Sequence, residues 1–396
     1  MFGAIYVGLS GLNAYARGLQ QVSNNVSNLN TSGFKGADVT FSNTVGGGST
    51  GGLSLSGTVS DGLGGVELGH SMTDFTQGEL RQTQRDLDLA VDGSGMLVLM
   101  RGDQTYFTRT GSFEVDKDGF IVLAGTDYRL ATLDSSGSPV TLSVDSFRTN
   151  PPEKTTTIKF SDNLSSTATT FSLSGIKVYD AAGTEHDWKA NFAKDTSSTA
   201  GPDDWTVTIT DEKGATVGQQ ALKFNNGVID PTTSQLTVTD SASGLSVLLD
   251  FSQNVTSYSS GEVSTLSTSS IDGHALGTIS SVIVNSDGDL QIGYSNQQTK
   301  DLGAVALADF KDPQALQQRS GGLYVDRGDA GRQYFSTASK EAGQVVSQRL
   351  EASNVDLAKQ FGDLITIQRG YQASSQIISV ANDMIQQLFG IRGQGG

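Results

Sequence analysis

The chain has 396 residues, with 26 Lys or Arg against 42 Asp or Glu, so its formal net charge is −16. This charge argues against binding to nucleic-acid phosphates, which requires basic clusters. The absence of Cys excludes disulfide frameworks, thiolate metal sites and thiol nucleophiles.

Residues 1–30 are predicted to form a helix. Apolar residues recur there at alternating intervals of four and three, which is the a/d spacing of a coiled-coil seam. The predicted seam, interrupted by Ser23, consists of Ile5, Leu9, Leu12, Ala16, Leu19 and Val26. No basic region precedes an apolar block at the start of the chain, so we expect export without a cleaved signal peptide. No apolar run approaches the roughly 18 residues of a membrane span, so we expect no membrane insertion.

Residues 31–70 and 336–349 are predicted to be connecting segments. The first contains a Gly-rich run at residues 46–52 that formally matches the G-x-G-x-x-G spacing of dinucleotide-binding loops. No β-α-β pattern surrounds this run, and repeated Gly matches the spacing by chance. We therefore interpret it as a linker.

Between the ends the apolar period changes to two, which predicts antiparallel β structure. Four D-x-x-G sequences suit type I turns that end with a left-handed Gly, and they begin at Asp116, Asp134, Asp180 and Asp211. A shift to a Ser-, Thr- and Asp-rich composition divides this region further. We expect an inner β domain from residues 71–147 and 278–335, with an outer β domain, residues 148–277, inserted into it.

Residues 350–396 are predicted to form a second terminal helix with the same seam spacing. The apolar seam residues are Leu350, Leu357, Phe361, Leu364, Tyr371, Ile378, Ile385 and Phe389. Further apolar residues, among them Ile365, Ile377, Val380 and Met384, make this stripe too wide for one partner helix. The predicted fold is therefore mainly β with α-helical termini that pair in a coiled-coil-like inner core and seek additional neighbours.

No pattern in the sequence predicts an enzyme, a cofactor or a metal site. Residues 285–289 resemble the start of a calcium loop but lack the distal Glu, and a hairpin turn is preferred. Asp86, Asp88 and Asp92 alternate with apolar residues, which is typical of a strand that exposes one face, here the carboxylates, to solvent. Trp188 and Trp205 suit either a carbohydrate-stacking surface or a core, and the core is favoured.

Two long motifs near the ends resemble those of the axial proteins of the bacterial flagellum, the family of rod and hook proteins. The amino-terminal motif, N-N-x-x-N-x-N-T-x-G-F-K, is represented by Asn24, Asn25, Asn28, Asn30, Thr31, Gly33, Phe34 and Lys35. The carboxy-terminal motif is represented by Asn354, Val355, Asp356, Leu357, Gln368, Arg369, Tyr371 and Gln372. The segments Phe75–Gly78, Leu87–Gly93 and Tyr106–Phe113 also resemble the family's first β block.

Within this family, the length of the chain and its outer insertion favour a hook protein. The resemblance implies self-assembly into a flexible tubular joint that transmits torque from rod to filament and encloses the export channel. It implies an extracellular location in the flagellum and, besides other copies of the chain, four partners: the distal rod protein, the hook cap protein, the hook-filament junction protein and the flagellar export apparatus. A distal rod protein and, in a different class, a secreted β-rich adhesin that binds carbohydrate stay open as alternatives.

Overall fold

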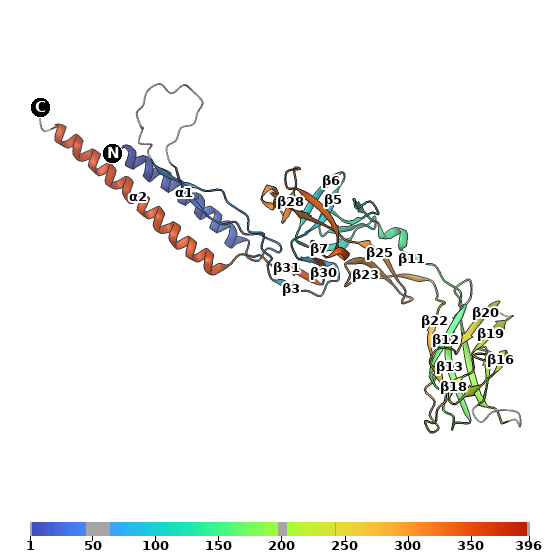
Figure 1. The fold of residues 1–396 in the computed structure, drawn as a ribbon. Coiled ribbons are helices and arrows are strands. Elements are labelled where there is room, and N and C mark those ends of the chain that lie inside the picture. The colour runs from blue at the N-terminus through green and yellow to red at the C-terminus, as the bar shows by residue number, and fades with distance from the viewer. Residues whose placement is uncertain (1, 45–63, 197–203, 242, 394–396) are drawn as a thin grey trace. The chain divides into compact units, whose positions relative to one another are not determined.

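The computed structural model describes residues 2–44, 64–196, 204–241 and 243–393. The predicted linker at residues 46–52 lies outside the described residues. The chain divides into two compact units. The first comprises Met1–Ser146, Val282–Gln291 and Asp301–Gly396, and the second comprises Phe147–Ser281 and Ile292–Lys300. As predicted, the described chain is mainly β, with a helix at each end (Figure 1).

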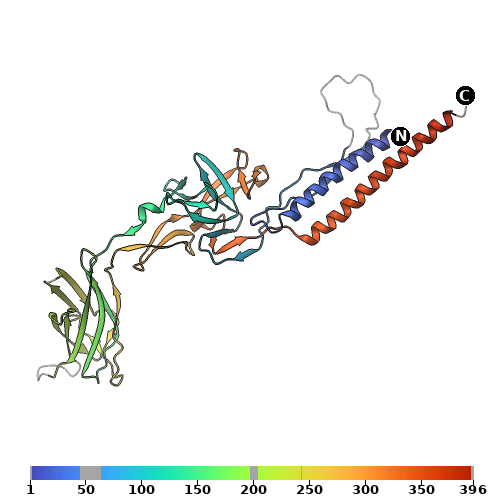
Figure 2. The same ribbon diagram turned by 180° about the vertical axis from the view of Figure 1, so that it is seen from behind.

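The two terminal helices, α1 (Phe2–Ser27) and α2 (Leu357–Gly393), pack side by side in the first unit. They run antiparallel, so the two ends of the chain lie at the same end of the helix pair (Figures 1 and 2). The carboxylate of Asp356 accepts the backbone N–H of Ala358 at 2.7 Å and that of Lys359 at 3.3 Å. This N-cap explains why α2 begins at Leu357.

The predicted start of the second helix at residue 350 is therefore wrong. Leu350 lies in strand β31 (Arg349–Glu351), where it pairs with Arg81 of β3 (Leu80–Gln82). The four-three spacing of apolar residues extends back into this strand only by coincidence. The signal for the helix start is Asp356, six residues after Leu350.

Three glycines allow the close approach of α1 and α2. A Cβ atom added at Gly8 would lie 2.6 Å from Ile378 Cγ1, and one at Gly11 would lie 2.5 Å from Ser374 Oγ. A Cβ at Gly370 would lie 2.4 Å from the ring of Tyr15. The intrinsic cost of Gly in a helix, about 1 kcal/mol relative to Ala, is thus accompanied by close helix packing at these positions.

The inner β structure of the first unit is one large antiparallel sheet. Along its main path the strands are β27 (Gln317–Arg319), β28 (Leu323–Val325), β6 (Gln104–Thr108), β5 (Met96–Arg101), β9 (Arg129–Leu133), β8 (Ile121–Leu123), β7 (Thr110–Val115), β4 (Asp88–Asp92) and β30 (Gln344–Ser347). Branching from it are β10 (Pro139–Thr141), β26 (Ala306–Phe310) and β29 (Arg332–Ser336). Phe107 and Phe310 meet edge to face in the core, with ring centroids 4.9 Å apart.

Among the described residues, three smaller sheets accompany the large one, and one of them is the pair of β3 and β31 given above. The hairpin of β1 (Phe41–Thr44) and β2 (Gly65–Leu68) packs against α1. A second antiparallel sheet has the order β11 (Thr149–Asn150), β23 (Gly277–Val284), β24 (Asp289–Tyr294) and β25 (Thr299–Ala304). These last three strands contain the residues at which the two units divide.

The second unit consists of two sheets around one apolar core. The first sheet has the order β13 (Thr170–Tyr179), β14 (Glu185–Lys194), β15 (Trp205–Thr210) and β16 (Thr216–Leu222). The second contains β17 (Phe224–Asn225), β18 (Val228–Ile229), β21 (Val255–Thr256), β12 (Thr157–Asn163), β20 (Leu245–Asp250), β19 (Gln235–Asp240) and β22 (Ser267–Ile271). Its pairing departs from the antiparallel prediction at β12, which runs parallel to β20 and β21.

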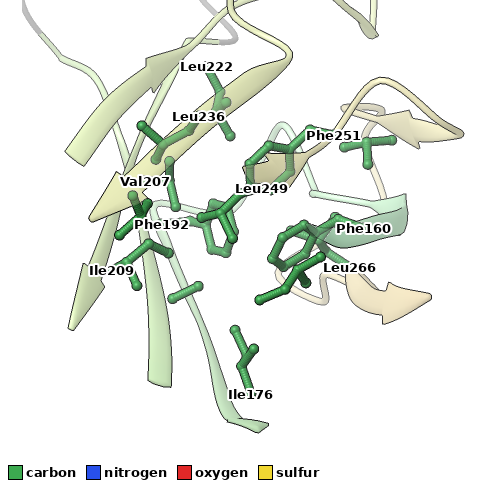
Figure 3. Close-up of a cluster of buried hydrophobic side chains, with 14 of the residues drawn as sticks. Phe160, Ile176, Phe192, Val207, Ile209, Leu222, Leu236, Leu249, Phe251 and Leu266 are labelled. Carbon is green, nitrogen blue, oxygen red and sulfur yellow. The ribbon is translucent and has the colours of Figure 1, made fainter. Parts of the chain in front are cut away.

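Apolar side chains from these strands point toward one another in the interior of the second unit (Figure 3). The rings of Phe160 and Phe251 stack with centroids 4.4 Å apart. Trp188 and Trp205 are 1% and 0% exposed. The preferred core interpretation of the tryptophans is therefore confirmed, and their rings form no surface for a sugar.

The predicted D-x-x-G turns are confirmed. Gly119, Gly137, Gly183 and Gly214 all have φ between 77° and 82°, and each donates its N–H to the carbonyl of the Asp three residues earlier. Residues 285–288 form the same turn, in which Asn285 Oδ1 accepts the N–H groups of Asp287 and Asp289. The hairpin interpretation of this segment is thus also confirmed.

Candidate assembly interface

The face that joins α1 to α2 is narrow and consists mainly of small side chains. In α1 it includes Ala14 and Val22, and in α2 it includes Ile367, Ser374 and Ala381, each less than 9% exposed. The α2 positions repeat every seven residues, as in a coiled coil. One helix partner therefore covers only one stripe of α2.

The predicted seam of the first helix does not coincide with this face. Ile5, Leu12, Ala16, Leu19 and Val26 are half-buried, and Leu9 is 55% exposed. The face directed at α2 is instead formed by residues such as Gly8, Gly11 and Gly18, which a search for large apolar residues overlooks. The role of the predicted seam as an interface between chains stays a prediction.

The predicted seam of the second helix contains both half-buried and exposed residues. Leu364, Ile378 and Ile385 are half-buried, whereas Leu357, Phe361 and Tyr371 are exposed. The side chain of Phe389 lies outside the described residues. Further exposed apolar side chains of α2 are those of Ile365, Ile377, Val380 and Met384. A large part of the apolar surface of α2 is thus open to a further partner.

Six residues before the start of α2, the carboxylate of Glu351 binds groups from three other parts of the chain. Its Oε1 lies 2.5 Å from Lys35 Nζ and accepts the N–H of Gly78 at 2.8 Å. Its Oε2 accepts Arg109 Nε at 3.2 Å. All three ionic side chains are at most 2% exposed. We call the buried group Lys35, Arg109 and Glu351 the junction cluster.

The junction cluster is electrostatically costly. It contains two cations and one anion, and Lys35 and Arg109 also donate to backbone carbonyls, among them those of Thr76 and Gly95. Burial lowers the pKa of Lys35 below its ordinary value, although Glu351 acts in the opposite direction. The pair with Glu351 therefore does not fully offset the desolvation of the ammonium group.

Asparagines continue this network to both helices. Asn25, near the end of α1, donates its Nδ2 to Gln360 Oε1 of α2 and to the carbonyl of Ala37, both at 2.9 Å. Asn354 accepts the N–H of Gly36 at 2.8 Å and donates to the carbonyl of Asp74 at 2.7 Å. The amides thus fix where the chain leaves α1 and where it enters α2.

Two glycines allow the backbone segments at the junction to approach one another closely. Gly33 has φ +70°, and its N–H donates to the carbonyl of Glu351 at 2.8 Å. At Gly78 an added Cβ would lie 2.1 Å from the backbone carbonyl oxygen of Ala352. Any other residue at position 78 would force these two backbone segments apart.

The structure therefore brings some residues of the two family motifs together at the junction and leaves others exposed. Asn25, Gly33, Phe34, Lys35, Asn354 and Val355 lie at the junction, and Asp356 caps α2. Asn24, Asn28 and Thr31 bond to one another where α1 ends. Asn30, Leu357, Gln368, Arg369, Tyr371 and Gln372 are exposed.

Sequence reasoning missed three residues of this site: Arg109, Glu351 and Gln360. Arg109 lies within the segment Tyr106–Phe113 that resembles the family, but neither spacing nor composition distinguishes a buried charge from a solvated one. The network joins residues as far apart in sequence as Asn25 and Gln360, so only the tertiary fold reveals it.

The described residues contain no group of three or more His, Asp or Glu side chains that could hold a metal ion. Asp88 is buried in β4 and bonds to Ser112 Oγ, so the prediction of an exposed carboxylate there is wrong. Within the described part of the chain, neither helix is apolar enough over a sufficient length to cross a membrane.

Both ends of the chain match family models. Residues 5–35 match the flagella basal body rod protein model, and residues 346–391 match the flagellar basal body rod FlgEFG protein C-terminal model. These ranges contain most of α1, the junction residues Lys35 and Glu351, and most of α2.

Similarity to curated proteins extends over the whole chain. The flagellar hook protein FlgE of Brucella suis is 30% identical over 410 residues, covering 99% of this chain and 99% of that protein. FlgE of Salmonella typhimurium is 28% identical, covering 97% and 98%. A crystal structure of a Helicobacter pylori hook protein matches 69% of the chain, with TM-score 0.47 and 12% identity. Because the similarity extends over the full length of these hook proteins, the chain belongs to the flagellar hook protein family, and its function is that of a structural subunit of the hook.

Proposed function

We propose that the chain polymerises through its terminal helices into the tubular hook that transmits torque from rod to filament. The observation that carries this proposal is the apolar surface of α2 that α1 leaves open, including Phe361 at 55% and Ile365 at 51% exposed. Burying each such side chain contributes about 1.5–3 kcal/mol, so contacts repeated over many copies stabilise a polymer.

Around this core, we propose the division of the chain predicted from its sequence: a terminal helical assembly domain, connecting segments, an inner β domain and an outer β domain. The partners expected at the ends of the polymer are the distal rod, cap and hook-filament junction proteins. The role requires no catalysis. The amide-rich faces of the helices, with Gln368 and Gln372 exposed, suit an export channel because they hydrate it without binding charged substrates.

The proposal is tested by comparing the full-length chain with a variant that lacks residues 1–27 and 357–396. This truncation retains Lys35, Arg109 and Glu351, so the inner β structure keeps its junction cluster. We expect tubes from the full-length chain in electron microscopy and folded monomers from the truncated chain.

A matched control replaces the exposed polar residues Gln372 and Ser379 of α2 by Ala, and we expect it to form tubes. Tube formation by the truncated chain would exclude the terminal helices as the assembly element. Glycan binding by the folded second unit would instead favour the adhesin alternative.

A further inference from the structure

The exposed apolar side chains of α2 change flank halfway along the helix. With the buried Ile367, Ser374 and Ala381 at position a of a heptad, Phe361 and Ile365 fall at b and f, whereas Val380 and Met384 fall at g and d. Around a helix these pairs of positions lie on opposite sides of a. The two apolar patches therefore face different directions.

Each flank is polar where the other is apolar. From residue 368 to residue 387 the b and f positions are occupied by Gln368, Gln372, Ser375, Ser379, Asn382 and Gln386. From residue 357 to residue 370 the d and g positions are occupied by Lys359, Asp363, Thr366 and Gly370, none of which has an apolar side chain. The patches are thus two separate surfaces rather than one continuous stripe.

The two patches also differ in shape. Leu357, Phe361 and Ile365 are exposed and lie four residues apart, so they form a ridge along the first half of the helix. In the second half, Ile377, Val380 and Met384 form, with Ala4 of α1, the apolar wall of a groove of about 420 Å³. None of the residues lining the groove is ionisable. Ridge and groove are complementary in chemistry.

A ridge cannot fill the groove of its own molecule. Phe361 and Val380 are 380 − 361 = 19 residues apart on one continuous helix, which at 1.5 Å per residue separates them by ~29 Å. A second copy of the chain is the source of an identical ridge, and self-assembly is the role proposed above.

We propose that the ridge Leu357–Phe361–Ile365 of one subunit docks into the groove at Ile377, Val380 and Met384 of a second subunit. This inference rests on the proposed polymerisation and adds its polarity. The contact joins two different surfaces and is heterologous. Such a contact leaves one free ridge and one free groove after every addition, so it propagates into an open helical polymer when the rotation does not close.

The absence of Cys from the chain allows a direct test by disulfide cross-linking. Polymers are assembled from Phe361→Cys, from Val380→Cys, from a mixture of both and from the double variant, and are then oxidised. We expect no covalent dimers from either single variant, dimers from the mixture and a ladder of multimers from the double variant on a non-reducing gel. Ile365→Cys with Met384→Cys provides a second pair.

The matched control is Ser375→Cys combined with Thr366→Cys, which occupies the same flanks in the polar halves of α2 and should give no ladder. Dimers from Phe361→Cys alone would show a contact between like surfaces and overturn the proposal. So would tubes from which neither cysteine pair gives a ladder. If the parent chain forms no tubes, the proposed polymerisation itself fails, which electron microscopy of the same samples distinguishes.

Discussion

Glu351 holds the negative charge shared by two buried cations, Lys35 and Arg109, so the three residues of the junction cluster are not equivalent. Glu351→Gln leaves two buried positive charges without this counter-ion, and we expect a loss of about 3–5 kcal/mol in unfolding free energy. Lys35→Met leaves Arg109 and Glu351 as a pair with balanced charge, so the loss of unfolding free energy should be clearly smaller than for Glu351→Gln. Denaturant unfolding followed by far-UV circular dichroism measures both.

Tryptophan fluorescence supplies the control for this pair of variants. Trp188 and Trp205 are the two tryptophans of the chain, and both lie in the second unit. The fluorescence therefore reports the unfolding of the second unit, and its midpoint should occur at the same denaturant concentration in both variants as in the parent chain. Equal losses from Glu351→Gln and Lys35→Met would contradict the unequal roles assigned to the charges.

The buried ammonium group also predicts a pH dependence. The pKa of Lys35 in the folded chain lies below its ordinary value of 10.5 because of burial. Between these two values the unfolded chain binds more protons than the folded chain, so the contribution of Lys35 to stability rises with pH.

The parent chain should therefore become more stable relative to Lys35→Met as pH increases toward 10.5. The measurement is the difference in unfolding free energy between the two proteins from pH 7 upward. Tyr324, whose pKa is raised to about 12 chiefly by burial, acts in the opposite direction above its ordinary value of 10.0, but it is present in both proteins. A difference that decreased toward pH 10.5 would exclude this account of Lys35.

At the scale of the helices, two glycines of α2 that look equivalent in sequence have different surroundings. An added Cβ at Gly370 would lie within 2.8 Å of three ring atoms of Tyr15, and that ring packs against Phe41 with centroids 5.0 Å apart. No atom lies within 4 Å of a Cβ at Gly362.

We therefore expect opposite effects from the same substitution. Gly362→Ala should stabilise α2 by about 1 kcal/mol, because Ala is the better helix former. Gly370→Ala should destabilise the helix pair, because the backbones or Tyr15 must move. Thermal unfolding followed by the helical signal at 222 nm compares the two, and stabilisation by Gly370→Ala would show that α1 and α2 do not pack this closely.

At the scale of the whole molecule, the outer insertion leaves and rejoins the chain at neighbouring residues. Asn150 and Gly277 are directly paired across β11 and β23. Residues 151–276 can thus be replaced by Asn-Gly, a two-residue sequence favoured in hairpin turns.

We expect this deletion variant to keep its inner β structure and to form tubes. The helix pair and the junction cluster lie outside the deleted residues. Circular dichroism and electron microscopy provide the measurements. A folded variant that stayed monomeric would show that the outer insertion supplies a contact required for assembly.

The sequence by itself determined the class of the fold, the two terminal helices, the D-x-x-G turns and the membership of the family. These features depend on local period, turn chemistry and long contiguous motifs, which neighbouring residues express directly. The start of α2 was also encoded locally, by Asp356, but the heptad spacing that continues to Leu350 obscured it.

Only the tertiary structure decided which faces of the helices meet and where the charges lie. Gly8, Gly11 and Gly370 mark the contact between α1 and α2 because a close approach requires the absence of a side chain, which apolar periodicity does not register. Lys35 and Glu351 pair across 316 residues of sequence, and their burial depends on strands that surround them in space. The same holds for the ridge and groove of α2, because exposure is known only once α1 has covered its own stripe.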